Sequence, residues 1–150
     1  MHAVLDEIAN HLEFFGYTIE KIEREDAPNM FVYYASHERY CNLRFLEVYK
    51  NFVCFQLGHW HDEHSTNTSA LAEVFNEFNR KSTLAKFYFT SDEDGSRILV
   101  YTEAVFIGEY EKQSFALFHD RFQAEARDAF ESDAYKSCFI AKEQQNCALQ

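Results

Sequence analysis

The feature that most constrains the fold is a change in the spacing of apolar residues along the chain. The first residues follow a helical period, with one apolar side and one polar side. From residue 17 to residue 58 the spacing changes to short aromatic and β-branched runs, which are typical of strands. The apolar side of the first helix consists of Val4, Leu5, Ile8, Leu12 and Phe15.

The rest of the chain repeats this alternation of helical and strand spacing. The elements predicted are a helix over residues 4–15, strands over 17–24, 30–35, 41–49 and 52–58, a polar loop over 59–69, a helix ending near residue 80, strands over 84–90 and 97–106, and a helix over about 114–131. The links between the first strands are too short for a crossover helix, which favours antiparallel pairing.

This order, α-β-β-β(-β)-α-β-β-α, predicts an α+β fold in which helices cover one face of an antiparallel sheet. The opposite face is expected to be partly solvated and available for binding. The 150 residues suit one domain, which we place at 1–131, followed by a C-terminal tail at 132–150.

The charge and the apolar content limit the classes of partner. The formal net charge is −11, with 25 acidic and 14 basic residues and no basic patch, so nucleic acids and anionic membranes are disfavoured. No apolar run has the ~20 residues that would span a bilayer. The four cysteines show no metal or redox spacing, and the first 15 residues do not resemble a signal peptide. We therefore expect a cytoplasmic protein.

The segment His59-Trp60-His61-Asp62-Glu63-His64 is the best candidate for metal chemistry. On a strand end, His59 and His61 would point to the same side, and imidazole and carboxylate groups suit zinc, nickel or copper. The spacing matches no established zinc pattern, so a solvated polar loop is the favoured interpretation and a metal-binding or metal-sensing domain the alternative. With no HExxH motif and no glycine-rich phosphate loop, we expect no cofactor and no catalysis.

A succession of motifs between residues 71 and 127 resembles the YbjN-like family, which shares the fold of type III secretion chaperones. It comprises Val74-Phe75-Asn76-Glu77-Phe78-Asn79, Ala85-Lys86-Phe87-Tyr88-Phe89, an acidic turn closing at Gly95, Ile98-Leu99-Val100-Tyr101, and Gly108 before the last helix. This sequence departs from the pattern in having four strand segments before the second helix and one glycine at position 108. The resemblance implies a bacterial, non-catalytic protein that binds a polypeptide client as a homodimer, either chaperone-like or as a regulatory adaptor.

Two sets of residues in this reading have alternative roles. Asn76 and Asn79 share a helix face; the favoured role for their amides is to bond nearby backbone and fix the helix to the sheet, and the alternative is ligand binding. Aromatic residues on the strands are candidates for partner binding, and the alternative is that they belong to the core. These aromatic candidates are Phe31, Tyr33, Phe45, Phe52 and Phe55.

Overall fold

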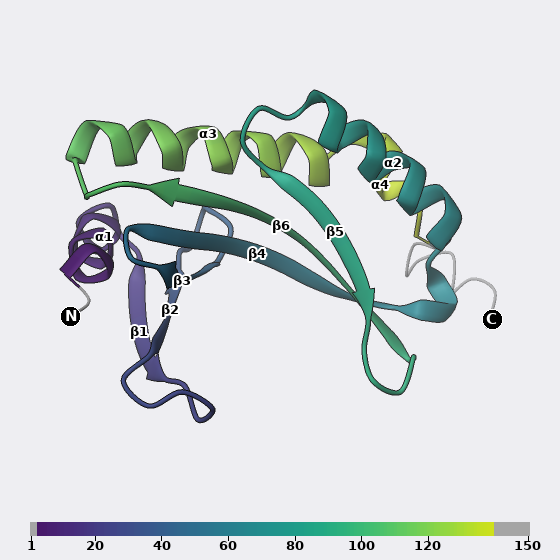
Figure 1. The fold of residues 1–150 in the computed structure, drawn as a ribbon. Helices are drawn as coiled ribbons and strands as arrows, with labels where there is room; N and C mark the ends of the chain where they lie inside the picture. Colours follow the sequence, from purple (N-terminus) through teal and green to yellow (C-terminus); the bar gives the residue numbers. More distant parts are fainter. Residues whose placement is uncertain (1–2, 140–150) are drawn as a thin grey trace. The chain divides into compact units, whose positions relative to one another are not determined.

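A computed structural model describes residues 3–139 (Figure 1). The elements, in order, are α1 (Ala3–Phe14), β1 (Thr18–Glu23), β2 (Phe31–Ser36), β3 (Leu43–Tyr49), β4 (Phe52–Asp62), a 3₁₀ turn η1 (Glu63–Ser65), α2 (Thr68–Lys81), β5 (Lys86–Ser91), β6 (Arg97–Ile107), α3 (Lys112–Phe130) and α4 (Asp133–Lys136). The predicted order of helices and strands is confirmed as far as α3, with the optional fourth strand present, and the short helix α4 lies within the predicted tail.

The strands form one six-stranded antiparallel sheet in the order β1-β2-β3-β4-β6-β5. β1 pairs with β2 from Thr18↔Ser36 to Glu23↔Phe31, and β3 pairs with β4 from Arg44↔Gln56 to Tyr49↔Phe52. The α+β prediction is therefore confirmed, and sequential strands are neighbours wherever a short turn joins them.

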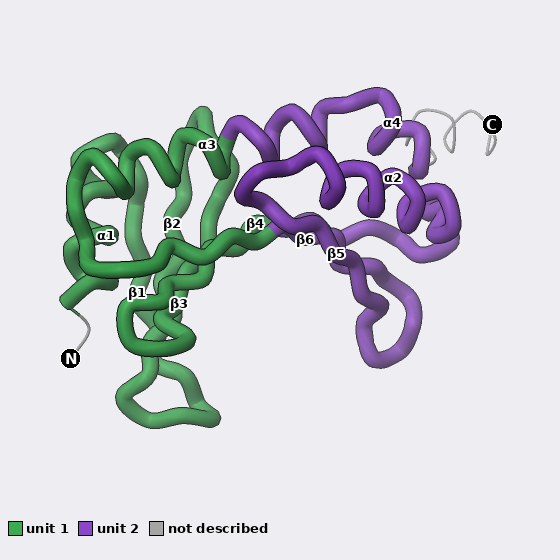
Figure 2. The backbone as a smooth tube through the Cα atoms, turned by 45° about the horizontal axis from the view of Figure 1, so that its top comes forward, with its two compact units in different colours: residues 1–57, 103–123 green, residues 58–102, 124–150 purple. Residues whose placement is uncertain are grey.

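The described residues divide into two compact units (Figure 2). Unit 1 contains the chain up to Leu57 together with Glu103–Gln123, and unit 2 contains Gly58–Thr102 together with the residues from Ala124 onward. The elements β4, β6 and α3 contribute residues to both units. Each unit has its own core.

In unit 1, the core is a row of stacked rings under two helical segments. Tyr33, Phe45 and Phe55 are paired across β2, β3 and β4, with ring centroids 5.1 and 5.2 Å apart. Phe115 of α3 lies 5.7 Å from Phe55. The buried side of α1, which includes Leu5, Ile8 and Leu12, packs on the same face, because its apolar stripe leaves no other side to bury.

In unit 2, a second aromatic core joins α2, β5 and the end of α3. Phe87 lies between Phe75 and Phe130, with ring centroids 5.8 Å from each. Tyr135 of α4 is buried and packs against Phe130 at 5.0 Å.

The first residues of the predicted tail belong to this core. The carbonyl of Cys138 accepts a hydrogen bond from the Asn67 N–H at 2.8 Å, and Thr66 forms an isolated antiparallel bridge with Phe139. The rest of the predicted tail, residues 140–150, lies outside the described residues.

The structure corrects the predicted loop over residues 59–69. β4 continues through His59–Asp62, and only residues after Asp62 leave the strand. β4 lies next to β6 in the sheet, and the Glu63 N–H donates to the Ser96 carbonyl at 3.1 Å just after the strand ends. Imidazole and indole rings are tolerated on a half-buried strand. Pairing with β6 therefore keeps this segment extended despite its polar composition.

The amide of Asn79 fixes α2 to the edge strand β5. Its Oδ1 accepts from the Phe87 N–H at 2.7 Å, and its Nδ2 donates to the Phe87 carbonyl at 3.0 Å. One side chain thus occupies the two backbone groups that another strand would use on this edge of the sheet. Asn76, three residues earlier, is exposed.

We expect Asn79→Ala to lower the free energy of unfolding by about 2 kcal/mol, because two backbone groups beside the core lose their partner. Asn76→Ala is the matched control on the same helix and should change it by less than about 0.5 kcal/mol. Urea denaturation followed by circular dichroism measures both. Equal effects of the two substitutions would show that Asn79 does not hold the helix in place.

Candidate interaction surface

The helices of unit 1 cover one face of its strands and leave the other face open. Along β2, β3, β4 and β6, buried residues alternate with residues that point to the uncovered side. We call this uncovered side the open face. Its exposed large apolar members are between 38 and 76 % exposed, whereas the exposed side of a sheet is usually polar. They are Ile22, Tyr34, Val48, Tyr49, Phe52, Val105 and Ile107.

A row of polar side chains crosses the middle of the open face. Arg44 Nε donates to Gln56 Oε1 at 3.0 Å, and Gln56 Nε2 donates to Glu103 Oε2 at 3.0 Å. The row joins β3, β4 and β6, and it pairs the one cation with the one anion through an amide. Because these groups already have partners, covering them with another protein costs less than burying isolated charges.

Cys54 lies beside this row and is buried. Its thiol donates to Glu103 Oε2 at 3.7 Å. Burial, and after it the negative charge of Glu103, raises the pKa of Cys54 to about 11. The thiol therefore stays protonated at neutral pH, which is the opposite of what a nucleophilic cysteine requires.

The structure places the five aromatic candidates in different environments. Tyr33, Phe45 and Phe55 are at most 2 % exposed and belong to the core of unit 1. Phe52 lies on the open face, and Phe31 is half-buried with the Lys21 ammonium 4.3 Å from its ring centroid. Period-two spacing identifies which residues share a face but does not say which face the helices cover.

Several open-face residues were not singled out from the sequence. Ile22, Tyr34 and Val105 each stand between residues that point to the opposite side of the same strand. The sequence signal that could have identified these residues is an apolar side chain at a position where an alternating strand normally has a polar one.

The three histidines of the metal candidate have separate environments. His59 packs edge-on against Phe130 with centroids 5.1 Å apart, while His61 shares a hydrogen bond of 2.9 Å with the Tyr135 hydroxyl and stacks on Phe139. His64 is exposed. Burial lowers the pKa of His61. Within residues 3–139, no three His, Cys, Asp or Glu side chains gather as metal ligands.

The glycines singled out in the sequence lie at turns. Gly95 adopts φ +71° in the hairpin between β5 and β6, and its N–H donates to the Asp92 carbonyl at 3.1 Å. Gly108 adopts φ +110° after β6, and its N–H donates to the Asn51 carbonyl at 2.8 Å. Both conformations favour a residue without a Cβ atom.

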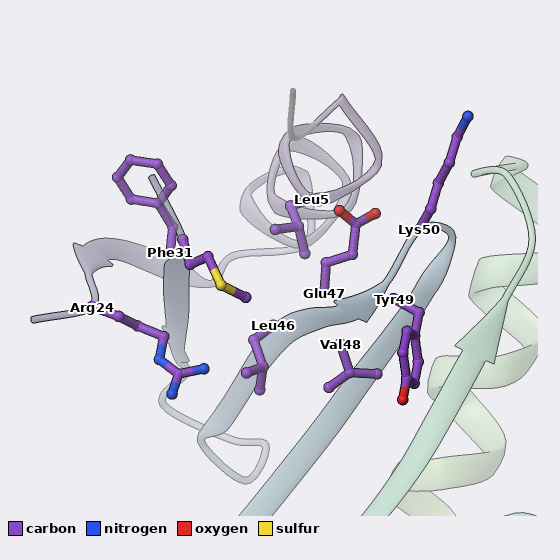
Figure 3. A pocket seen from close by; sticks show the side chains of 9 residues that line it. Leu5, Arg24, Phe31, Leu46, Glu47, Val48, Tyr49 and Lys50 are labelled. Carbon is purple, nitrogen blue, oxygen red and sulfur yellow. The ribbon is translucent and has the colours of Figure 1, made fainter. Parts of the chain in front are cut away.

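A pocket of about 290 Å³ opens at one end of the open face (Figure 3). It lies where β2 and β3 separate, beside the first turns of α1. Figure 3 shows Leu46, Val48 and Tyr49 on one side of β3, and Glu47 pointing to the other side, toward Leu5. The lining consists of Leu5, Arg24, Met30, Phe31, Leu46, Glu47, Val48, Tyr49 and Lys50.

Comparison with known proteins places this chain in a family. The model of the YbjN family, described as "putative bacterial sensory transduction regulator", matches residues 5–132. The chain belongs to the YbjN family. The match includes all of β1 to β6 and ends beside α4. The resemblance inferred from the motifs between residues 71 and 127 is thus confirmed over a longer part of the chain.

A solved structure of another YbjN protein has the same fold. It is the crystal structure of YbjN from E. coli, described as a putative transcription regulator, with a TM-score of 0.62 and 13 % sequence identity. The similarity covers 91 % of this chain and 96 % of that one. No curated protein matches the sequence. No helix in the part of the chain that the structure describes has the length and hydropathy needed to cross a bilayer.

Proposed function

We propose that this YbjN protein is a non-catalytic regulatory adaptor that acts by binding another polypeptide through the open face of unit 1. The observation that carries the proposal is the apolar character of a sheet face that no helix within residues 3–139 covers. Membership in a family of bacterial regulators supports the regulatory part of the proposal.

Leaving this apolar face in water costs free energy. Seven large apolar side chains share one side of a single sheet, and grouped exposed apolar surface marks interaction sites in soluble proteins. Tyr34 and Phe52 add aromatic contact area, which supplies much of the binding energy at protein interfaces. The hydrogen-bonded row of Arg44, Gln56 and Glu103 adds polar groups that need no new partner when the face is covered.

The protonation states of the buried groups also favour binding over catalysis. A general acid or base works best when its pKa is near the working pH. Burial instead lowers the pKa of His119 to about 4 and raises that of Cys54 to about 11. These groups hold their neutral forms at pH 7 and contribute to the structure as hydrogen-bonding partners.

Site-specific photo-crosslinking in the native bacterium tests the proposal. A benzophenone amino acid at position 34, on the open face, is expected to capture one main protein. The same group at Leu117, a 72 % exposed residue of α3, is the matched control and should capture little. Val105→Asp should weaken the captured complex at least roughly tenfold, because a carboxylate would be buried at its centre, with the melting temperature nearly unchanged. Equal capture from both positions would contradict the proposal.

A second copy of this chain is the other polypeptide to be tested on this face, since a homodimer is implied by the resemblance to secretion chaperones. Size-exclusion chromatography with light scattering at high micromolar concentration distinguishes the two cases. A dimer that Val105→Asp dissociates would assign the face to self-association; a monomer that still yields the crosslink assigns it to a different protein.

A further inference from the structure

The pairing between β2 and β3 ends early, although both strands continue. The register runs from Ala35↔Leu43 to Tyr33↔Phe45 and stops there. The same register would next bring residues 30–32 opposite 46–48. Instead, β2 remains paired with β1 as far as Glu23↔Phe31, and β3 remains paired with β4 as far as Tyr49↔Phe52.

Local backbone features explain why the two strands separate. The β3–β4 register shifts between Glu47 and Tyr49, and such a bulge bends and twists the strand that carries it. Asn29, just before β2, adopts φ +70°, which ends the extended conformation of β2 on that side. The Glu47 carboxylate accepts from the Asn51 N–H at 3.2 Å and is thereby held toward the turn.

The pocket occupies this separation. The residues that would have continued the ladder line it: Met30 and Phe31 from the β2 side, and Leu46, Glu47 and Val48 from β3. Leu5 of α1 closes the helix side (Figure 3). One edge of β3 from Leu46 to Tyr49 pairs with β4, and its other edge faces the pocket.

We propose that this pocket receives one aliphatic or aromatic side chain of a partner polypeptide, whose backbone extends along the edge of β3 at Leu46–Tyr49. This inference rests on the proposed function, because Val48 belongs both to the open face and to the pocket. It adds the position at which the partner is anchored and the conformation in which it binds.

The chemistry of the pocket favours a polypeptide over a metabolite. Its volume is at the lower limit of small-molecule sites, which span roughly 300–1,000 Å³. Two of its three charged groups are already engaged, since Arg24 forms two hydrogen bonds of 3.0 and 2.7 Å with Asp26, and the Glu47 carboxylate accepts from the Asn51 N–H. The remaining lining is mostly apolar, and a strand edge offers a row of backbone groups that an extended peptide pairs in series.

Fluorescence anisotropy with two synthetic peptides tests the inference on the full chain. The probe is fluorescein-labelled Thr-Val-Thr-Phe-Thr-Val-Thr, and the matched peptide has Ser in place of Phe. Burial of one Phe side chain should make the probe bind roughly tenfold to a hundredfold more tightly than the Ser peptide. Met30→Trp, at a 38 % exposed position, should fill the pocket and abolish this preference, while Met30→Leu keeps it.

Hydrogen exchange locates the bound peptide. The amides of Leu46–Tyr49 should become protected when the probe binds, and those of the β5 edge should not.

The inference fails if neither peptide binds at millimolar concentration, if Met30→Trp keeps the preference for Phe, or if protection appears elsewhere. It also fails if Met30→Trp dissociates a homodimer that excludes the probe, since the occupant is then a second copy. Loss of the open-face crosslink in Val105→Asp stands apart from all these outcomes, so the proposed function can survive the failure of the anchor.

Discussion

Phe55→Ala is expected to lower the free energy of unfolding by about 3–5 kcal/mol. Phe55 has no exposed surface. The centroid of its ring lies 5.2 Å from the ring centroids of Phe45 and Phe118 and 5.7 Å from that of Phe115. Its removal leaves a cavity between the sheet and α3 that the surrounding rings can fill only in part. Since small proteins unfold with about 5–15 kcal/mol, this loss is a large share of the total. Chemical denaturation followed by circular dichroism measures it.

Phe52→Ala is the matched control for this prediction. Phe52 lies on the same strand three residues earlier, is 39 % exposed and points to the open face. Its truncation should cost less than about 1 kcal/mol of stability but weaken the complex captured at position 34. A Phe55→Ala protein as stable as Phe52→Ala would contradict the core position of Phe55.

Lowering the pH from 7 to 4 is expected to remove up to about 3 kcal/mol of stability through His119 alone. This side chain of α3 is 13 % exposed. The Tyr17 hydroxyl oxygen accepts a hydrogen bond from Gln123 Nε2 at 3.2 Å, and it lies 3.1 Å from His119 Nε2. The hydroxyl proton of Tyr17 is therefore donated to His119 Nε2, which must be unprotonated to accept this bond. Burial lowers the pKa of His119 from 6.5 to about 4.

The direction of the pH effect follows from these two pKa values. The unfolded chain takes up a proton on this histidine below about pH 6.5, whereas the folded protein does so only near pH 4. The stabilising contribution is complete above pH 6.5, falls as the pH decreases through this window, and is lost below about pH 4. His119→Gln keeps a side chain that can accept from Tyr17 and removes the titration.

The difference in unfolding free energy between the native protein and His119→Gln isolates this contribution from that of the other histidines. It should change by up to about 3 kcal/mol between pH 7 and pH 4, in favour of the variant at acid pH. Urea denaturation at several pH values gives the comparison. Parallel pH profiles for the two proteins would rule out His119 as the source of acid sensitivity.

The sequence was sufficient for the order of elements because each one carries its own local signal. The apolar stripe from Val4 to Leu12 has a helical period, and alternation marks the strands that hold Tyr33, Phe45 and Phe55. Short links then required antiparallel neighbours. The extension of β4 through His59–Asp62 was missed, because the composition there is polar and pairing with a distant strand makes it extended.

Only part of the candidate site could be predicted from the sequence. Phe52 was identified and lies on the open face, but Tyr34 and Val105 became candidates only once the covered face was known. The separation of β2 from β3 has no local signature, since Met30–Val32 and Leu46–Val48 read as ordinary strand residues. It depends on a bulge between Glu47 and Tyr49 and on the backbone of Asn29.

By itself, the sequence determined the order of the main helices and strands and which side chains share a side of each element, because the period of apolar residues is a local property of the backbone. Only the tertiary structure decided which side of the sheet is buried and where two neighbouring strands part. Those outcomes depend on helices and strands far apart in the chain, whose packing energy no short segment contains.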